Sequence, residues 1–170
     1  MDKADRQKLA TYIMDAFKKS EYPGDDNLGW GEADAFIGKK RDDLSAEVLR
    51  KYEEALTYFS PEAFRYYLPV YLYNVIMHPA PMDVVVDGII FILTPLDKSD
   101  IHDKRLEHLD LRAALVRRTQ AFSQEENVAV YKFISNYADL EPDSSWVTDR
   151  YIILQKAIEF WKEKATPSNA

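Results

Sequence analysis

The chain has 170 residues and no cysteine, with 46% hydrophobic residues, 30% charged residues and a formal net charge of -7. This profile is that of a folded globular domain, and it excludes a disordered or fibrous chain, disulfides, thiolate catalysis and cysteine-bound metals. The acidic balance disfavours nucleic acid and anionic membrane surfaces as partners and favours a basic protein.

The first residues carry charges where a secretion signal would need an apolar segment. The longest apolar run, Val84 to Leu93, is interrupted by Asp87 and is about half as long as a membrane span. We therefore expect a cytoplasmic protein without a membrane partner.

Two helices are predicted in the first forty residues. Residues 4–19 place apolar side chains at three- and four-residue intervals, which is the spacing of an amphipathic helix. Turn-forming residues follow at 22–27. A short helix is then expected over 32–37, and Gly38 closes it.

Two further helices are predicted over 45–58 and 60–78. A serine at the start of each is placed to accept a hydrogen bond from the first turn. Pro61 occupies the first helical position of the second helix, where its missing N–H costs nothing. Pro79 ends that helix, because the residue before a proline is disfavoured in helical geometry.

The segment from Met82 to Leu93 is ambiguous. Its valines and isoleucines have the side-chain types of a strand. Strict alternation is absent, however, and its large apolar residues fall on one helical stripe. We predict a buried helix here, with a strand as the alternative.

Two helices are predicted near the C-terminus. Ser123 and Glu126 have the spacing of a capping box, in which each side chain bonds to the backbone of the other residue. The helix that follows should run to about Leu140. A last helix is expected to begin at Ser145.

The domain organisation follows from these elements. Residues 94–108 form the longest predicted loop, and an apolar and basic segment follows at 109–118. No Gly/Ser linker or low-complexity block divides the chain. We therefore predict one all-α domain over residues 1–165, a compact bundle of about six to seven helices, with a disordered tail at 166–170.

Aromatic side chains crowd residues 58–79. On a helix, Tyr67 and Tyr71 fall on the broad apolar face and should lie in the core. Tyr66 and Tyr73 point elsewhere, so we expect them at a rim or contact surface.

Pro69 interrupts the predicted helix over 60–78, because it removes one hydrogen bond and should bend the helix. The bend has two interpretations, a structural kink in the core or the opening of a pocket. Arg65 lies close to it and can pair with Glu62 one turn away. If its guanidinium is buried, it must pair with a carboxylate of another helix, for which Glu53 and Glu54 are nearest in sequence.

No cofactor, metal or catalytic residue is predicted. Asp25, Asp26 and Asn27 are consecutive, whereas a calcium loop needs alternating ligands and a distant glutamate. His102 and His108 are six residues apart and do not match the spacing of a zinc site on a helix. No phosphate-binding loop and no nucleophile motif occurs.

Several motifs resemble a family of short bacterial proteins of unknown function. They are Tyr22-Pro23-Gly24-Asp25, Phe36-Ile37-Gly38-Lys39, Ser60-Pro61-Glu62-Ala63-Phe64-Arg65-Tyr66-Tyr67-Leu68-Pro69 and Phe122-Ser123. The resemblance extends over residues 20–140, and the chain departs from the pattern at Lys40-Arg41, where an aromatic residue is expected. It implies a bacterial, cytoplasmic and helical protein, and it brings no activity, cofactor or catalytic residue.

We expect a protein-binding module without catalysis, because the chain is acidic and carries no catalytic motif. Small acidic proteins of this kind are often antitoxins or immunity proteins, whose negative surface attracts and blocks a basic toxin. The candidate contact residues are Asp25, Asp26, Asp42, Asp43, Arg65, Tyr66, Tyr73, Asp97 and Asp100.

Two other functions are open at this point. The chain could be a small-molecule-binding protein or enzyme with a pocket at the Pro69 bend, whose polar groups come from the outward-facing arginine and tyrosines near it. It could also self-associate through aromatic residues that the core does not use, such as Trp30 and Trp161.

Overall fold

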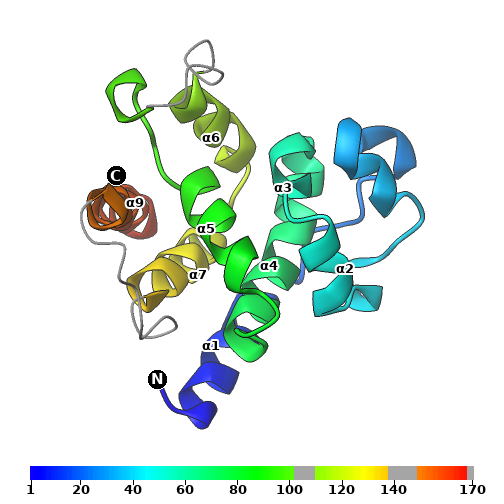
Figure 1. Cartoon of the computed structure of the whole chain (residues 1–170), viewed down its shortest axis with the longest axis horizontal. Helices are drawn as coiled ribbons and strands as arrows, with labels where there is room; N and C mark the ends of the chain where they lie inside the picture. The colour runs from blue at the N-terminus through cyan, green and yellow to red at the C-terminus, as the bar shows by residue number, and fades with distance from the viewer. Residues whose placement is uncertain (102–109, 138–148, 168–170) are drawn as a thin grey trace.

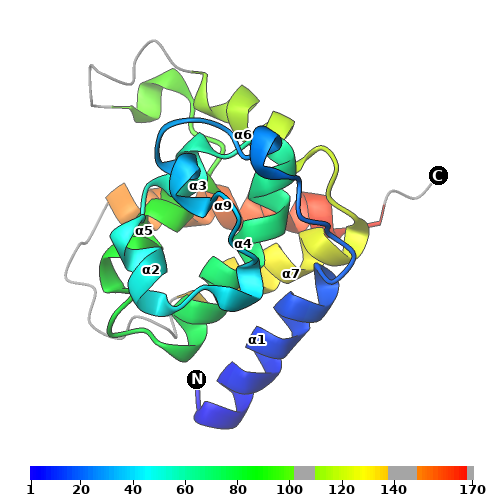
Figure 2. The ribbon, with the colours of Figure 1, turned by 90° about the vertical axis from the view of Figure 1, so that its right-hand side faces the viewer.

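Helix α4 (Pro61–Met77) runs through the centre of the fold (Figures 1 and 2). The structure is a computed structural model that describes residues 1–101, 110–137 and 149–167. Most side chains of α4 are buried. Helix α1 (Lys3–Ala16) packs along it, so the N-terminal helix and the aromatic helix form the first layer of the fold.

The boundaries of α4 agree with the sequence prediction. Ser60 Oγ accepts a hydrogen bond of 3.1 Å from the amide of Ala63, and Pro61 occupies the first turn. The helix ends at its C-cap, His78, directly before Pro79. Local signals at both ends therefore set the length of this helix.

Tyr67 and Tyr71 lie in the core of the fold, as predicted, and neither is exposed to solvent. The Tyr67 hydroxyl donates to the carbonyl oxygen of Lys39 at 2.6 Å, and the Tyr71 hydroxyl donates to that of Tyr52 at 2.9 Å. Burial raises the pKa of both phenols. Each ring therefore contributes apolar area to the core and has a partner for its polar end.

A second layer consists of α7 (Gln124–Ser135) and α9 (Asp149–Ala165), which pack against each other. Helix α5 (Asp83–Ile92) joins this layer to α4. Trp161 of α9 is completely buried, and its indole N–H donates to the carbonyl oxygen of Leu93 at 2.8 Å. Trp161 therefore belongs to the core and offers no surface for self-association.

Short elements cover the side of α4 that lies to the right in Figure 1. They are η1 (Asp25–Asn27), η2 (Gly31–Phe36), η3 (Arg41–Asp43), α2 (Ala46–Lys51) and α3 (Ala55–Tyr58). The short helix expected before Gly38 is present as the 3-10 helix η2, which packs on α3.

The prediction of one helix over 45–58 is wrong, because the segment forms α2 and α3 with a break between them. At Tyr52 the backbone leaves helical geometry, with φ -118° and ψ 52°. The Tyr52 carbonyl oxygen accepts the hydroxyl of buried Tyr71. The same oxygen also accepts the amide of Ala55 at 3.2 Å, a tighter turn than that of an α-helix. The break at Tyr52 therefore coincides with the tertiary contact to the buried Tyr71 hydroxyl, which needs a partner.

The ambiguous segment Met82–Leu93 is helical, as predicted, and forms α5. Its buried residues are Val85, Val86, Ile89 and Ile90. They have the three- and four-residue spacing of one helical stripe, so the periodicity of the apolar residues outweighs their individual preference for strands.

Helix α6 (Leu111–Thr119) forms where the sequence indicated only an apolar and basic segment. Asp110 caps it by accepting the amide of Ala113 at 2.8 Å. Its Arg118 donates to the carbonyl oxygen of Thr57, and its guanidinium lies 5.7 Å from the ring centre of Phe64. The basic residue thus attaches α6 to α3 and α4.

The predicted capping box begins α7. The amide of Ser123 donates to Glu126 Oε2 at 2.6 Å, and the amide of Glu126 donates to Ser123 Oγ at 3.2 Å. Helix α7 ends at Ser135, before the predicted end at about Leu140. The predictions for 102–109, 138–148 and 168–170 lie outside the described residues.

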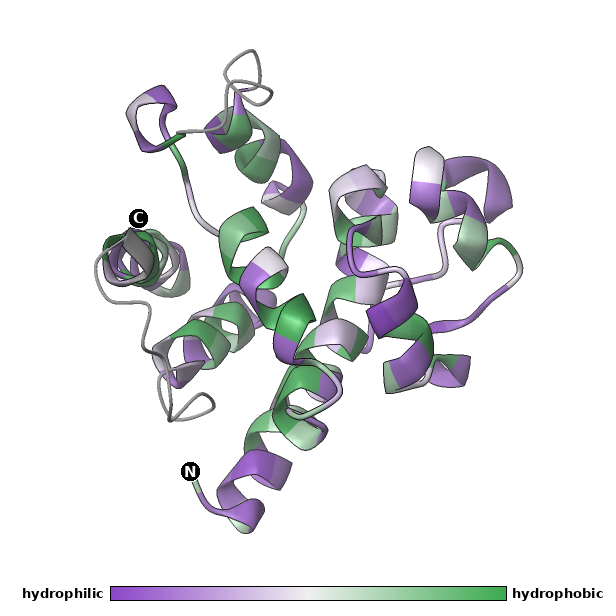
Figure 3. Ribbon diagram, viewed as in Figure 1, coloured by the Kyte–Doolittle hydropathy of each residue, from purple (hydrophilic) through white to green (hydrophobic). Residues whose placement is uncertain are grey.

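The described elements are helices, and they form one compact all-α domain, as predicted. Figure 3 shows hydrophobic residues on the helix faces that meet around α4 and α5, and hydrophilic residues on the outer surfaces. Within the described part of the chain, no helix combines the length and the apolar character that a bilayer crossing requires.

Candidate functional site

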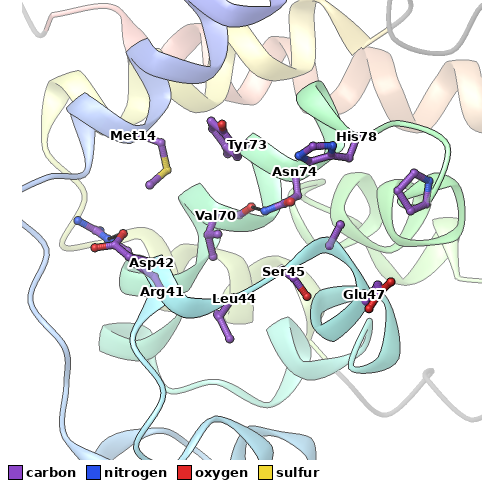
Figure 4. A pocket seen from close by; sticks show the side chains of 12 residues that line it. Met14, Arg41, Asp42, Leu44, Ser45, Glu47, Val70, Tyr73, Asn74 and His78 are labelled. Carbon is purple, nitrogen blue, oxygen red and sulfur yellow. Dashed lines mark hydrogen bonds and ion pairs between the residues drawn. The ribbon is translucent and has the colours of Figure 1, made fainter.

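A groove with a volume of about 750 Å³ lies beside the C-terminal half of α4 (Figure 4). We call it the α4 groove. Its walls come from α1, from the η3–α2 segment, from α4 and from the loop that follows α4. The lining residues are Met14, Arg41, Asp42, Leu44, Ser45, Ala46, Glu47, Val70, Tyr73, Asn74, His78 and Pro81.

One wall carries three polar side chains of α4 and its C-cap. Asn74 and His78 are four residues apart and therefore lie on the same side of the helix, next to Tyr73. Asn74 is only 5% exposed, and its Nδ2 donates to the carbonyl oxygen of Val70 at 2.8 Å. Among the described residues, its Oδ1, the Tyr73 hydroxyl and the His78 ring make no hydrogen bond, so these groups are available to a ligand.

The opposite wall carries carboxylates. Asp42 and Glu47 are exposed, and Ser45 lies between them as the N-cap of α2, accepting the amide of Val48 at 3.4 Å. Figure 4 shows these side chains across the groove from Tyr73 and Asn74. The wall therefore presents negative charge to the polar groups of α4.

Arg41 lines the groove, but its side chain is already engaged by the fold. Its Nη1 donates to the carbonyl oxygen of Phe17 at 3.1 Å and to Ser20 Oγ at 2.8 Å. Its guanidinium also lies 4.9 Å from the ring centre of Tyr66, and the side chain is only 12% exposed. Its Nε lies 3.9 Å from Asp42 Oδ1, so Arg41 offsets part of the charge of Asp42. Hydrogen-bond acceptors still make up most of the accessible polar surface of the groove.

The groove combines an apolar surface with hydrogen-bond acceptors. Its apolar part comes from methionine, leucine, alanine, valine and proline side chains, and its polar part comes mainly from acceptors. Among the described residues, no hydroxyl donates to a histidine, and no group of three histidine, aspartate or glutamate side chains is arranged to hold a metal ion. A cationic group on an apolar stem matches this combination of surfaces.

Tyr66 is buried, so the prediction that it faces outward is wrong. It is 7% exposed. The ring of Tyr22 packs edge-on against it at 5.6 Å, and Arg41 covers it from another side. The Arg41 amide also donates to its hydroxyl at 3.3 Å. Helical spacing along α4 could not show that the chain between α1 and α2 folds back over this face.

Arg65 forms a structural ion pair, but not with the partners that the sequence suggested. Its Nε donates to both carboxylate oxygens of Glu126, at 2.9 and 3.1 Å. Glu126 is 1% exposed and belongs to α7. The expected partners Glu62, Glu53 and Glu54 are close in sequence, whereas the pairing links helices that meet only in the folded chain.

The pocket expected at the Pro69 bend does not include Pro69, and the polar residues expected to line it lie in different places. Pro69 is buried and lines none of the cavities described here. Tyr73 lines the α4 groove one turn further along the helix. Arg65 lines a separate cavity of about 380 Å³, together with residues such as Lys19 and Pro61.

Asp25 belongs to a local network. It accepts the hydroxyl of Tyr22 and, at 2.8 Å, the amide of Gly38. These two hydrogen bonds, that of Tyr22 first, hold the pKa of Asp25 below its ordinary value. Lys40 lies 3.5 Å from the ring centre of Tyr22. The Tyr-Pro-Gly-Asp turn therefore ties η1 to the end of η2, and the neighbouring Asp26 is exposed.

Asp97 and Asp100 lie elsewhere, as the N-cap and the last residue of η4 (Lys98–Asp100). Asp97 pairs with Arg112 at 3.5 Å, and Asp100 pairs with Lys156 at 2.5 Å. Figure 1 shows the green turn that contains them on the opposite side of α4 from the blue and cyan segment with the other acidic pairs. Of the six candidate aspartates, Asp42 alone lines the α4 groove, and Asp43 is exposed next to it. The six do not form one continuous surface.

Sequence reasoning missed most of the groove. Asn74 and His78 received no functional role, although an asparagine and a histidine four residues apart on an apolar helix were a detectable signal. The sequence predicts Ser45 only as a helix cap, and no motif marks Glu47. Nothing in the sequence indicated that α2 would face this part of α4.

Fold and groove together define an all-α protein with an open, acceptor-rich groove beside its central helix. The chain belongs to a family of unknown function, DUF6714, whose model matches residues 5–165. The family match extends beyond both ends of the resemblance seen in the sequence motifs. Comparison with curated proteins found no match, and comparison with solved structures found none either.

Proposed function

We propose that this chain is a protein-binding module without catalysis and that a basic segment of its partner occupies the α4 groove. The observation that carries the proposal is the arrangement of the polar groups there. Asp42 and Glu47 face the open acceptor of Asn74, while the nearest cation, Arg41, is held by Phe17 and other groups of the fold.

A lysine or arginine side chain fits this arrangement. Its aliphatic part can lie against Met14, Leu44 and Val70, and its charged end can reach the acceptors. The net charge of -7 attracts a basic partner over a longer range and raises the rate of encounter. The same charge repels nucleic acid and anionic membranes.

The most specific form of the proposal is an immunity or antitoxin protein. In this form the chain is bacterial and cytoplasmic, and it covers the basic active surface of a toxin. The support is its small size, its negative charge and the absence of a catalytic motif from its sequence. A partner of this kind would be encoded by the neighbouring gene.

The proposal is tested by co-purifying the chain with the product of the neighbouring gene. We expect a complex whose dissociation constant rises between about 0.02 and 0.15 M salt, because screening weakens charge-driven association. The double substitution Asp42→Asn and Glu47→Gln should weaken the complex about tenfold.

The matched control is the double substitution Glu125→Gln and Glu163→Gln. It removes the same charge from exposed positions of α7 and α9 that do not line the groove. We expect the control variant to change the affinity by less than about threefold, because remote surface charges contribute little. An equal loss in both double variants, or a complex that does not respond to salt, would contradict binding in the groove.

A second candidate function is the binding of a small cationic molecule. The groove volume of about 750 Å³ lies within the range of small-molecule sites, and Tyr73, Asn74 and His78 offer converging polar groups. Mass spectrometry of compounds released from the purified protein tests it. A stoichiometric amine whose retention is lost in Tyr73→Ala would favour this candidate, and the absence of any retained compound would favour a protein partner.

A further inference from the structure

Trp30 is a large aromatic residue that the core does not use, because 68% of it is exposed. It lies immediately before η2. Its amide donates to the carbonyl oxygen of Tyr58 at 3.3 Å, and the amide of Ser60 donates to the carbonyl oxygen of Leu28 at 2.8 Å. These backbone contacts fasten the segment around Trp30 to the chain between α3 and α4.

Two glycines make this attachment possible. Gly29 has φ +132°, and a Cβ atom there would lie 2.1 Å from the carbonyl oxygen of Tyr58. Gly31 has φ +62°, and its Cα passes close to the ring of Tyr58. Both backbone conformations favour glycine over any other residue. The local chain is therefore built to bring the backbone on either side of Trp30 against α3.

The result is an indole held in place and open to solvent. The rings of Trp30 and Tyr58 meet nearly at right angles, with interplanar angle 82° and centroids 4.6 Å apart. Tyr58 thus supports Trp30 from one side. An exposed tryptophan that is already positioned loses little conformational freedom on binding, which is the property of an anchor residue in an interface.

The short elements beside Trp30 carry more acidic than basic residues, although Arg118 of α6 donates to the carbonyl oxygen of Thr57, next to Tyr58. Residues 30–37 and 52–58, which contain η2 and α3, carry four carboxylates and no lysine or arginine. Glu53 and Glu54 are exposed, and Glu54 lies one helical turn before Tyr58. Burial and then the charges of Glu54 and Glu53 raise the pKa of Glu32. Burial is the larger cause, and the two neighbouring carboxylates act in the same direction.

We infer that Trp30 is an anchor for an arginine of the basic partner, whose guanidinium stacks on the open face of the indole and pairs with Glu53 or Glu54. Arginine suits both parts of this contact, because its planar cation stacks on indole rings and binds carboxylates. The inference rests on the proposed basic partner and adds a second point of contact outside the α4 groove. A second copy of the chain fits poorly, because it would bring the same carboxylates to the interface.

The test uses an acetylated and amidated tetra-arginine peptide as the probe. Heteronuclear NMR spectra of the full chain follow the indole N–H of Trp30, which the Trp30→Phe spectrum assigns. We expect this resonance to shift saturably with the peptide, and Trp30→Ala to weaken binding about fivefold although it removes no charge. Glu53→Gln with Glu54→Gln should weaken it by a similar factor.

Tyr151→Ala is the matched control, because Tyr151 is 64% exposed on α9, away from η2. It should leave the affinity for the peptide unchanged. If Trp30→Ala binds the peptide as tightly as the natural chain, the contact is general electrostatic attraction and the inference is overturned. Sedimentation velocity tests whether a second copy of the chain binds at Trp30 instead. A concentration-dependent dimer that Trp30→Ala abolishes would also overturn the inference.

The outcome is separable from that of the proposed groove function. The Asp42→Asn and Glu47→Gln variant should bind the peptide with the Trp30 resonance shifting as before, since neither residue adjoins η2. Loss of partner binding in that variant alone would support the groove and overturn the Trp30 anchor. Loss in Trp30→Ala alone would support the anchor and contradict the groove.

Discussion

A single side chain, Glu126, serves two helices. Its carboxylate accepts the amide of Ser123 and thereby caps α7, and it also accepts two contacts from Arg65 of α4. It is 1% exposed, whereas the Arg65 side chain is 30% exposed. Burying a carboxylate is unfavourable unless it is paired and hydrogen-bonded, and here three donor contacts satisfy it.

The substitution Glu126→Gln should lower the free energy of unfolding by about 2 kcal/mol, because Arg65 loses its counter-charge while the glutamine can still cap the helix. Urea denaturation followed by circular dichroism measures this. Asp5→Asn removes the exposed partner of Lys8 and should change the value by about 0.5 kcal/mol or less. Equal effects of the two substitutions would show that the buried pair contributes no more than a surface pair.

Glu32 predicts a dependence of stability on pH. Its pKa is raised from the ordinary 4.5, first by burial and then by Glu54 and Glu53. The folded state therefore binds the proton more tightly than the unfolded state. This contribution to stability is fully present below the ordinary pKa and is lost as the pH rises through the raised pKa.

We accordingly expect Glu32→Gln to be more stable than the natural chain near neutral pH, with the difference disappearing below about pH 4. Urea denaturation at both pH values tests this. The control Glu62→Gln changes an exposed glutamate of α4 and should show no such difference. A Glu32→Gln protein that is less stable at neutral pH would contradict the stated cause of the pKa shift.

Among the helices, those with clear capping residues or a clear apolar stripe are predicted by local sequence signals. The serine and proline before α4, the capping box of α7 and the apolar stripe of α5 each predicted a helix that the structure contains. The segment 45–58 shows the limit of this reasoning. Its residues favour a helix throughout, but the helix breaks at Tyr52, whose carbonyl oxygen accepts both the Ala55 amide and the hydroxyl of Tyr71 from α4.

Two glycines give opposite predictions at this scale. Gly29→Ala places a Cβ against the Tyr58 carbonyl oxygen at an unfavourable φ, so it should destabilise the fold by about 2 kcal/mol or more. Gly88 lies inside α5, and nothing is within 4 Å of an added Cβ. Gly88→Ala should therefore stabilise the fold by about 0.5 to 1 kcal/mol. Unfolding midpoints in urea measure both changes, and the same sign for both would contradict the account.

In the whole molecule, α4 lies between the short N-terminal elements and the layer of α7 and α9 (Figure 1). Helix α4 contacts α2, α3 and η3 on one side, and it also contacts α1, α5 and α6. A core shared in this way should unfold as one cooperative unit.

Trp161→Phe tests this cooperativity. The substitution leaves the Leu93 carbonyl oxygen without its donor and opens space between α5 and α9, so it should cost about 3 kcal/mol. Far-ultraviolet circular dichroism reports helices on both sides of α4, and the NMR signal of the Trp30 indole N–H reports the η2 side. We expect both transitions to move by the same amount. Separate shifts would show that the two sides unfold independently.

The candidate site was only partly accessible to prediction. Side chains that a single helix exposes can be assigned from their spacing, and Tyr73 was assigned correctly to the outward set in this way. The same spacing argument places Tyr66 in the outward set. Tyr66 is nevertheless buried, because a loop distant from α4 in sequence covers it. The acidic pairs were visible as residues, but their separation around α4 depends on packing.

The amino-acid sequence by itself determined the all-α class, the ends of the central helix, the helical state of the Met82–Leu93 segment and the burial of Tyr67 and Tyr71. These properties depend on capping residues and on apolar periodicity, which act within one or two helical turns. The pairing of Arg65 with Glu126, the groove between α2 and α4, and the burial of Trp161 follow from the tertiary structure alone. Each of these depends on contacts between segments that are distant along the chain, and local propensities contain no information about which segments will meet.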